Sequence, residues 1–327
     1  MEPITLEQII ENEMPAETMS HTYSWWKPLL ADVATAAVVL CTFALFHHVL
    51  PSSATPNVTT PPSVEDEDSS SAFSKMEQTF LEHFQFAPIT DENSYVSKNL
   101  IIENSSHTIE KNGEPIAYCV ADVYVRDINC FRTAFADDTF GATGNFLEMG
   151  KTNKSVLAVS GDYCTWNRGG PVIRNGVLYR NKRGTADVCV LYKDGSMKTV
   201  AGREFDAAAA LDEGAWQAWA FGPSLLTADG KAATNFNSTL TDKHPRCAIG
   251  YYEPGHYVFV VVDGRQKHSV GMTLSELAEL FESLGCTMAY NLDGGRSAQI
   301  AFDDELLNQP YRGGRDVSDI VYLREVE

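Results

Sequence analysis

The chain has 327 residues, of which 44% are hydrophobic and 21% charged, so its composition excludes a wholly disordered or collagen-like chain. Its length fits about two domains, or one mixed domain with appended segments. The formal net charge of −19 repels phosphate backbones, so we expect no nucleic-acid partner.

An apolar segment near the N-terminus predicts a membrane anchor. Residues 29–46 are 18 mostly apolar residues with one charge, Asp32, and this is the length that a spanning helix needs. A buried core helix and a signal peptide cleaved near residues 52–54 are the alternatives, although a signal peptide normally has a basic start. Because Lys27 precedes the span and the next Lys or Arg is Lys75, charge predicts a cytoplasmic N-terminus and an external C-terminal domain.

The chain is thereby divided into four parts. The segment after the span is rich in Pro, Ser, Thr and acidic residues, a composition that cannot bury a core. The parts are a cytoplasmic tail (1–28), a transmembrane helix (29–50), a disordered linker (51–72) and one folded domain (73–327). We therefore expect a single-pass protein of the cell membrane, attached through residues 29–50, with its C-terminal domain outside the cell.

The first half of the folded domain is expected to consist of short strands and turns. Residues 116–126 have the composition of a strand. Asn175-Gly176 and Asp194-Gly195 each separate two apolar runs, and such dipeptides predict β-hairpins.

A strand, a helix and a second strand are predicted toward the C-terminus. Residues 257–262 form a continuous apolar run that indicates a buried strand. A capping box opens a helix at Thr273, and Gly285 is placed to end it. Residues 286–293 follow as the next strand, which we expect to run parallel to the first. The predicted fold class is α/β, with an α+β mixed sheet in a single domain.

Three acidic residues share one position in this pattern. Asp162, Asp263 and Asp293 each end a predicted strand, and Asn291 lies just before the last of them. Any one alone is more often a turn residue, but ligand sites in α/β sheets favour the carboxyl ends of strands. Paired carboxylates suit glycosidic bond cleavage. Clustered carboxylates also suit Ca²⁺ or Mg²⁺, and no other cofactor is implied.

Four arginines, Arg246, Arg265, Arg296 and Arg315, lie close to these acids in the sequence. Arginine binds phosphate through paired hydrogen bonds, but these side chains could also be solvated or neutralise the acids. A site that combines carboxylates, arginines and glycine-rich backbone suits a sugar joined to a phosphate.

Seven cysteines are present, and none has the spacing of a zinc site. Six lie outside the apolar N-terminal segment and could form up to three disulfides or remain free thiols, and their spacing does not decide between these alternatives. These six are Cys119, Cys130, Cys164, Cys189, Cys247 and Cys286.

An ordered series of short motifs carries a family resemblance. The series is VSGDY (159–163), VIRNGVLY (172–179), GAWQ (214–217), FGP (221–223), RCAIG (246–250), VVDGR (261–265), GMTLSELA (271–278), NLDGG (291–295) and DVSDIV (316–321). In this order the motifs resemble the phosphodiester glycosidase family, which includes the lysosomal uncovering enzyme and bacterial exopolysaccharide-associated proteins.

The resemblance implies hydrolysis of the glycosidic bond in a sugar-1-phosphodiester, such as a GlcNAc-1-phosphate link in a surface polysaccharide or related glycan. We expect an acid/base among the catalytic candidates Asp293, Asp263 and Asp162, a phosphate contact from Arg246 and a sugar contact from Asn291. Gly294 and Gly295 would let backbone amides approach the ligand. The other expected substrate-binding residues are Arg265, Arg296 and Ser297.

One position departs from the family pattern. The family usually has a third glycine where this chain has Arg296. If that glycine needs a positive φ or a close ligand approach, arginine distorts or blocks the site; otherwise Arg296 adds a phosphate contact. Two further functions therefore stay open: a non-catalytic glycopolymer-binding or assembly protein, and a metal-dependent phosphodiesterase that cleaves the P–O bond.

Overall fold

The structure is a computed structural model that describes residues 83–167 and 169–326. These residues fall within one compact unit, Asp66–Glu327. No helix in the described part of the chain is long and apolar enough to cross a membrane. The tail, anchor and linker predicted for residues 1–72 lie outside the described residues.

The largest sheet has seven strands, and every pairing in it is antiparallel. In order across the sheet the strands are β1 (Ile89–Thr90), β2 (Ser94–Val96), β3 (Leu100–Lys111), β4 (Glu114–Val125), β13 (His256–Val262), β12 (Arg246–Glu253) and β14 (Met288–Leu292). The strand predicted at residues 116–126 is confirmed as β4.

Two five-stranded antiparallel sheets complete the fold. One consists of β10 (Met197–Val200), β9 (Val188–Tyr192), β11 (Ala215–Trp219), β7 (Val172–Arg174) and β8 (Val177–Arg180). The other consists of β16 (Glu305–Leu306), β15 (Ile300–Phe302), β6 (Leu157–Ser160), β17 (Asp319–Leu323) and β5 (Phe131–Phe135). Both predicted hairpins are confirmed: β7–β8 turns at Asn175-Gly176 and β9–β10 turns at Asp194-Gly195.

The predicted strand–helix–strand unit is present as β13, helix α5 (Leu274–Ser283) and β14. The two strands run in the same direction, but they are not neighbours. Strand β12 lies between them and pairs antiparallel with both. Asp263 and Asp293 consequently follow the carboxyl ends of two strands that point the same way. The fold is therefore sheet-rich with few helices rather than a run of parallel βαβ units.

Helix α5 begins and ends where the local signals place it. The Glu276 N–H donates to Thr273 Oγ1 at 3.1 Å, and the Thr273 N–H donates to Glu276 Oε2 at 2.9 Å, which completes the capping box. Gly285 follows the helix with φ of 83°, the left-handed conformation that glycine adopts at little cost. Leu277 and Phe281 are fully buried against the seven-stranded sheet.

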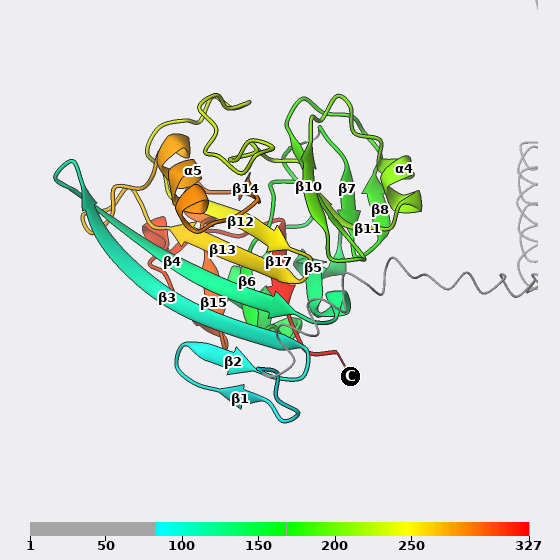
Figure 1. The fold of residues 1–327 in the computed structure, drawn as a ribbon, viewed down its shortest axis with the longest axis horizontal. Helices are drawn as coiled ribbons and strands as arrows, with labels where there is room; N and C mark the ends of the chain where they lie inside the picture. The colour runs from blue at the N-terminus through cyan, green and yellow to red at the C-terminus, as the bar shows by residue number, and fades with distance from the viewer. Residues whose placement is uncertain (1–82, 168, 327) are drawn as a thin grey trace, which may run out of the picture. The chain divides into compact units, whose positions relative to one another are not determined.

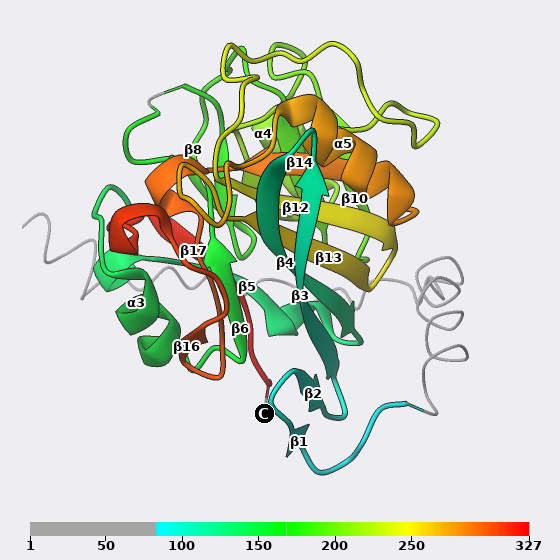
Figure 2. The ribbon, with the colours of Figure 1, turned by 90° about the vertical axis from the view of Figure 1, so that its left-hand side faces the viewer.

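The core lies between the sheets. The largest hydrophobic cluster draws side chains from all three sheets, including Val123, Val159 and Trp219. Helix α5 covers the opposite face of the seven-stranded sheet (Figures 1 and 2). Two short helices, α3 (Phe146–Thr152) and α4 (Ala207–Asp212), pack on the five-stranded sheets. This arrangement leaves the loops after β13 and β14 at one edge of the large sheet.

The six cysteines of the folded domain are free thiols, so the disulfide alternative is wrong for the described residues. All six are buried. Burial raises the pKa of Cys130 and Cys286 to about 12, which keeps both thiols protonated at neutral pH.

Candidate active site

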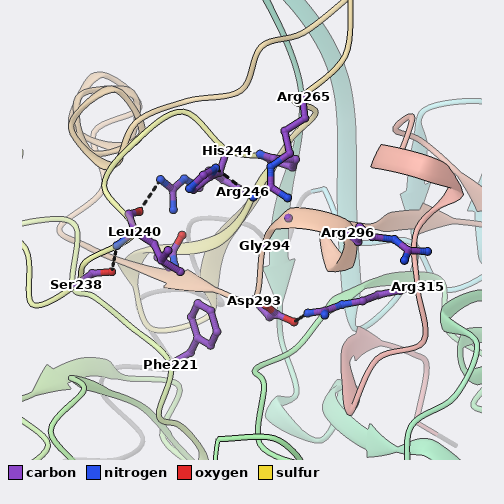
Figure 3. Close-up of a pocket in the computed structure, with 13 residues that line it drawn as sticks. Phe221, Ser238, Leu240, His244, Arg246, Arg265, Asp293, Gly294, Arg296 and Arg315 are labelled. Atoms are coloured by element: carbon purple, nitrogen blue, oxygen red, sulfur yellow. Dashed lines mark hydrogen bonds and ion pairs between the residues drawn. The ribbon is translucent and has the colours of Figure 1, made fainter.

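A pocket with a cavity volume of about 290 Å³ opens beside the carboxyl end of β14 (Figure 3). Its walls come from loops that are far apart in the sequence. They include Phe221, Leu240, His244, Arg246, Arg265, Asn291, Asp293, Gly294, Gly295, Arg296 and Arg315. The structure therefore brings together seven of the ten residues that the sequence predicts for the site.

The lining carries a strong positive charge. Four arginines line the pocket, and Asp293 is the one carboxylate among the described residues of its wall. The positive charge of this lining contrasts with the net charge of −19 of the whole chain. Guanidinium groups bind phosphate and carboxylate oxygens in pairs of hydrogen bonds, so the pocket suits an anionic ligand.

Asp293 is held at the pocket wall through its backbone and its carboxylate. The Asp293 N–H donates to the carbonyl oxygen of Gly161, 3.1 Å away. Burial raises the pKa of the Asp293 carboxyl above its usual range, while hydrogen bonds from Ser297 and Arg315 act in the opposite direction. A raised pKa brings a carboxyl group closer to the range in which it both gives and takes a proton at neutral pH.

Arg315 connects Asp293 to the surrounding wall. Its Nη2 donates to Asp293 Oδ2 at 2.9 Å, and its Nε donates to Ser297 Oγ at 2.6 Å. The guanidinium group also lies 5.1 Å from the ring centroid of Tyr163. Ser297 is fully buried and is thus a positioning residue for Arg315 rather than part of the open surface.

Asn291 presents an unpaired acceptor. Its Nδ2 donates to the carbonyl oxygen of Gly222 at 2.9 Å, which fixes the orientation of the amide. Its Oδ1 is buried and has no hydrogen-bond partner among the described residues. Buried polar atoms are almost always paired, so this oxygen is suited to accept a hydrogen bond from a ligand hydroxyl or N–H group.

Arg246 begins β12, and within the described part of the chain its side chain donates to carbonyl groups alone. Its Nε donates to Met272 O at 3.0 Å, and its Nη2 donates to the carbonyl oxygens of Leu240 and Asp242 at 2.9 and 2.6 Å. Burial, and then the charge of Arg265, lower the pKa of Arg246 to about 10. The group remains a cation at neutral pH, and a bound anion would relieve this unfavourable environment.

Arg265 has a strained backbone that places its side chain at the pocket. Its φ of 58° lies in the left-handed region, which costs a non-glycine residue about 1 kcal/mol or more. The guanidinium Nη2 donates to His244 Nδ1 at 3.2 Å. Burial, followed by the charges of Arg246 and Arg265, lowers the pKa of His244, so its ring stays neutral and can accept this bond.

The two glycines after Asp293 are required by the backbone. A Cβ atom at Gly294 would lie 2.6 Å from the carbonyl oxygen of Pro245. Gly295 has φ of 62°, and its N–H donates to the same oxygen at 2.9 Å. The Gly295 amide is therefore bound within the protein rather than free to contact a ligand.

Arg296 occupies its position without backbone distortion. It lies inside a short 3₁₀ helix, Gly295–Ser297, and the positive φ of this turn falls on Gly295. Its Nε and Nη2 donate to the carbonyl oxygen of Gly314 at 3.2 and 2.8 Å. In Figure 3 the side chain points away from Arg246 and Arg265, and the backbone at Arg296 has no positive φ.

Asp162 lies behind the wall and not on it. Its Oδ1 is 3.0 Å from Arg174 Nη2, and its Oδ2 accepts from the N–H of Ala220 at 3.1 Å. The same Arg174 Nη2 is 2.8 Å from Asp319 Oδ2. All three charged side chains are at most 3% exposed. Asp162, Arg174 and Asp319 therefore form a buried ion-pair cluster that joins separate strands and does not face the pocket.

Asp263 also points away from the pocket. Its Oδ1 accepts from Asn308 Nδ2 at 2.9 Å, and its Oδ2 lies 3.0 Å from His268 Nε2. The N–H of Gln309 donates to both oxygens. The carboxylate therefore joins the loop that carries Arg265 to the segment after β15, and of the three predicted carboxylates only Asp293 reaches the pocket.

The described residues contain one group of side chains that could hold a metal ion, and its ligand atoms do not fit Ca²⁺ or Mg²⁺. Both ions prefer several oxygen ligands. Among the described residues, Asp162, Cys164 and Asp319 are the group whose ligand atoms lie within 4.8 Å of one another. One of the three is a thiol, and both carboxylates bind Arg174. This group is therefore not suited to hold either cation.

Several pocket residues have no signal in the sequence. Leu240 and His244 lie in loops outside the motifs and reach the pocket only through the fold, whereas Phe221 belongs to the FGP motif (221–223) without a predicted role. Arg315 is recognisable as an arginine near the acids, but its bond to Asp293 joins residues 22 positions apart. Local pattern analysis does not detect such contacts.

Comparisons with known proteins identify relatives of this chain. The sequence profile described as phosphodiester glycosidase matches residues 153–324. An uncharacterized protein from the SPbeta prophage of Bacillus subtilis, YomE, is 38% identical over 182 residues. That match covers 52% of this chain but only 28% of YomE, so this chain spans well under half the length of that relative.

Two solved structures share the fold. One is the zebrafish N-acetylglucosamine-1-phosphodiester alpha-N-acetylglucosaminidase catalytic domain, auto-inhibited by its pro-peptide, with a TM-score of 0.59 and 21% identity. The match covers 70% of this chain and 85% of that one. A hypothetical protein from Synechocystis matches with a TM-score of 0.54 and 14% identity, covering 70% of this chain and 63% of that one. At such identities the likeness concerns the fold.

Proposed function

Because this chain belongs to the phosphodiester glycosidase family, we propose that it hydrolyses the glycosidic bond of a sugar-1-phosphodiester. One observation carries this proposal: a single pocket combines four arginines, a buried carboxyl group with a raised pKa and an unpaired amide oxygen. The arginines can bind the phosphate group, the carboxyl group can transfer a proton, and the amide oxygen can bind a substituent of the sugar.

The arginines suit the phosphate. In Figure 3 Arg246 and Arg265 lie above Gly294, and Arg315 lies to its right beside Asp293. Arg315 is already bound to Asp293, whereas Arg246 contacts only carbonyl groups and Arg265 contacts a neutral histidine. We therefore assign the phosphate to Arg246 and Arg265, where their charges stabilise the negative charge that develops on the departing oxygen.

Asp293 suits the proton transfer. Water attacks the anomeric carbon, the bond between that carbon and the phosphate oxygen breaks, and the phosphate monoester leaves with the bonding electrons. The Asp293 carboxylate takes the proton of the attacking water, and the arginines stabilise the leaving oxygen without protonation. Asn291 Oδ1 accepts a hydrogen bond from the sugar, which orients the anomeric carbon toward the water.

The substrate we propose is a GlcNAc-1-phosphate link in a surface polysaccharide or related glycan. The Asn291 oxygen suits the N–H of an N-acetyl group as well as a hydroxyl. We further propose that the folded domain acts outside the cell, attached through the apolar segment at residues 29–46. Protease digestion of intact cells that express the chain tests this placement, since an external domain is degraded and a cytoplasmic one is protected.

Isotope labelling tests the reaction. The full chain is incubated with GlcNAc-1-phosphate methyl diester in ¹⁸O-water, and the products are identified by mass spectrometry. We expect free GlcNAc that carries ¹⁸O and methyl phosphate that does not. Label in the phosphate, together with GlcNAc-1-phosphate as product, would instead establish P–O cleavage by a phosphodiesterase. Saturable binding of the diester without turnover would favour the non-catalytic glycopolymer-binding protein.

A further inference from the structure

A second cavity, of about 280 Å³, lies between β5, β17 and the end of α3. Arg132 on β5 is directly opposite Tyr322 on β17, and Arg324 follows β17. None of the residues that line this cavity lines the pocket around Asp293. Its chemistry therefore requires an explanation of its own.

Three polar atoms of the cavity residues are buried without a partner. Arg132 Nε, Arg324 Nε and Thr133 Oγ1 have no hydrogen bond to any described residue. A buried polar group that is left unpaired is destabilising, and native proteins keep few of them. Three in the lining of one cavity indicate that hydrogen-bond donors are collected there for a ligand.

The charge of the cavity is positive. Neither Arg132 nor Arg324 forms an ion pair within the described part of the chain, and the one acidic residue of the lining, Asp138, lies beyond ion-pair distance of both. Burial raises the pKa of the Tyr322 hydroxyl, and the charges of Arg324 and Arg132 act in the opposite direction. The hydroxyl itself is 3.3 Å from Asn153 Oδ1.

The surroundings hold this arrangement in place. The Arg132 guanidinium lies 5.3 Å from the ring centroid of Trp216, a cation–π contact that orients its plane. The Trp216 indole N–H donates to Phe131 O at 2.6 Å. Asn175 bonds to both the N–H and the carbonyl oxygen of Thr133, which fixes the edge strand that carries the site. The donors are thus positioned before any ligand arrives.

We propose that this cavity is a second oxyanion site, which binds a phosphate group through Arg132 and Arg324. The guanidinium groups of Arg132 and Arg324 and the buried hydroxyl of Thr133 can donate hydrogen bonds to the oxygens of a phosphate. Neither arginine has to be released from a carboxylate first. The proposal does not depend on the glycosidase reaction. A free phosphate and a phosphate carried by a glycan offer the same chemistry to this site.

Trp216 supplies a local readout. The full chain, labelled with ¹⁵N, is titrated with inorganic phosphate while the indole N–H signals are followed, and Trp216→Phe identifies the Trp216 signal. We expect a saturable shift of that signal. We expect the Arg132→Gln/Arg324→Gln variant to lose the shift or to need at least tenfold more phosphate.

A matched control removes the same charge elsewhere. Arg183 and Arg203 are exposed, so Arg183→Gln/Arg203→Gln should keep the shift. If the cavity variant fails to fold, Arg324→Gln alone replaces it, because Trp216 contacts Arg132 and not Arg324. No saturable shift in the unmodified chain, or an equal shift in the folded cavity variant, would overturn the proposal. Titration with methyl phosphate then separates free phosphate from phosphate in an ester.

Discussion

Asp162 and Asp293 occupy equivalent places in the sequence, each just after a strand, yet they have different environments. Asp162 faces Arg174, whose side chain is 1% exposed. Asp293 faces Arg315, whose side chain is 35% exposed and borders an open pocket. Asp162 is enclosed by protein and does not line the pocket, whereas Asp293 borders a pocket that a ligand can enter. The position of an acid at a strand end therefore does not by itself identify a catalytic group.

The buried cluster has more negative than positive charge. Asp162 and Asp319 share Arg174, which also donates to the carbonyl oxygens of Ile173 and Ala218. Burial raises the pKa of Asp319 to about 7, although Arg174 acts to lower it. The cluster is packed tightly, because a Cβ atom at Gly161 would lie 2.4 Å from Asp319 Oδ1.

Replacement of the pocket carboxylate should have the largest effect on activity. Asp293→Asn keeps the shape but removes the proton acceptor, so we expect kcat to fall by about 10³-fold. Stability should change little, because the side chain borders a pocket rather than the core. The measurement is steady-state hydrolysis of the GlcNAc phosphodiester, with Glu279→Gln as an exposed control. A variant that keeps activity within a few-fold of the unmodified chain would show that another group moves the proton.

Replacement of the buried cation should have the largest effect on stability. Arg174→Met leaves two buried carboxylates without a counter-ion, and we expect a loss of about 3–5 kcal/mol in the free energy of unfolding. Lys198→Met is the matched control, because Lys198 pairs with Glu213 on the surface and both side chains are more than half exposed. That change should cost less than about 1 kcal/mol.

Urea unfolding followed by circular dichroism measures both variants. Equal losses in the two variants would contradict the distinction between the buried cluster and an ordinary surface ion pair.

Asp319 should make stability depend on pH. Its folded pKa of about 7 lies above its ordinary value of 3.8, so the unfolded chain releases this proton first as the pH rises. The stabilisation is therefore complete below about pH 4 and is lost progressively up to about pH 7. Asp319→Asn should remove this slope. The urea midpoints of the unmodified chain and of Asp319→Asn, measured at several pH values between 4 and 7.5, test this prediction. If the midpoints of both proteins change with pH in the same way, the prediction is wrong.

Local signals predict the parts of the fold that local physics determines. The capping box at Thr273 and the Asn175-Gly176 turn each depend on neighbours in the sequence, and both are where they were predicted. The insertion of β12 between β13 and β14 has no such signal, because strand pairing joins distant segments. The same holds for Arg174, whose partner Asp319 is 145 residues away. The sequence therefore locates Asp293 but cannot separate it from Asp162.

The departure from the family pattern should have the smallest effect. The Arg296 side chain donates to the Gly314 carbonyl, and the backbone at this position needs no positive φ. Arg296→Gly should therefore change kcat/KM by only a few-fold and cost about 1 kcal/mol of stability through the added backbone freedom. Arg246→Gln, at the group to which we assign the phosphate, should raise KM far more. If Arg296→Gly instead created activity in an inactive chain, the arginine would block the site, and the natural protein would be a glycopolymer-binding protein on an enzyme fold.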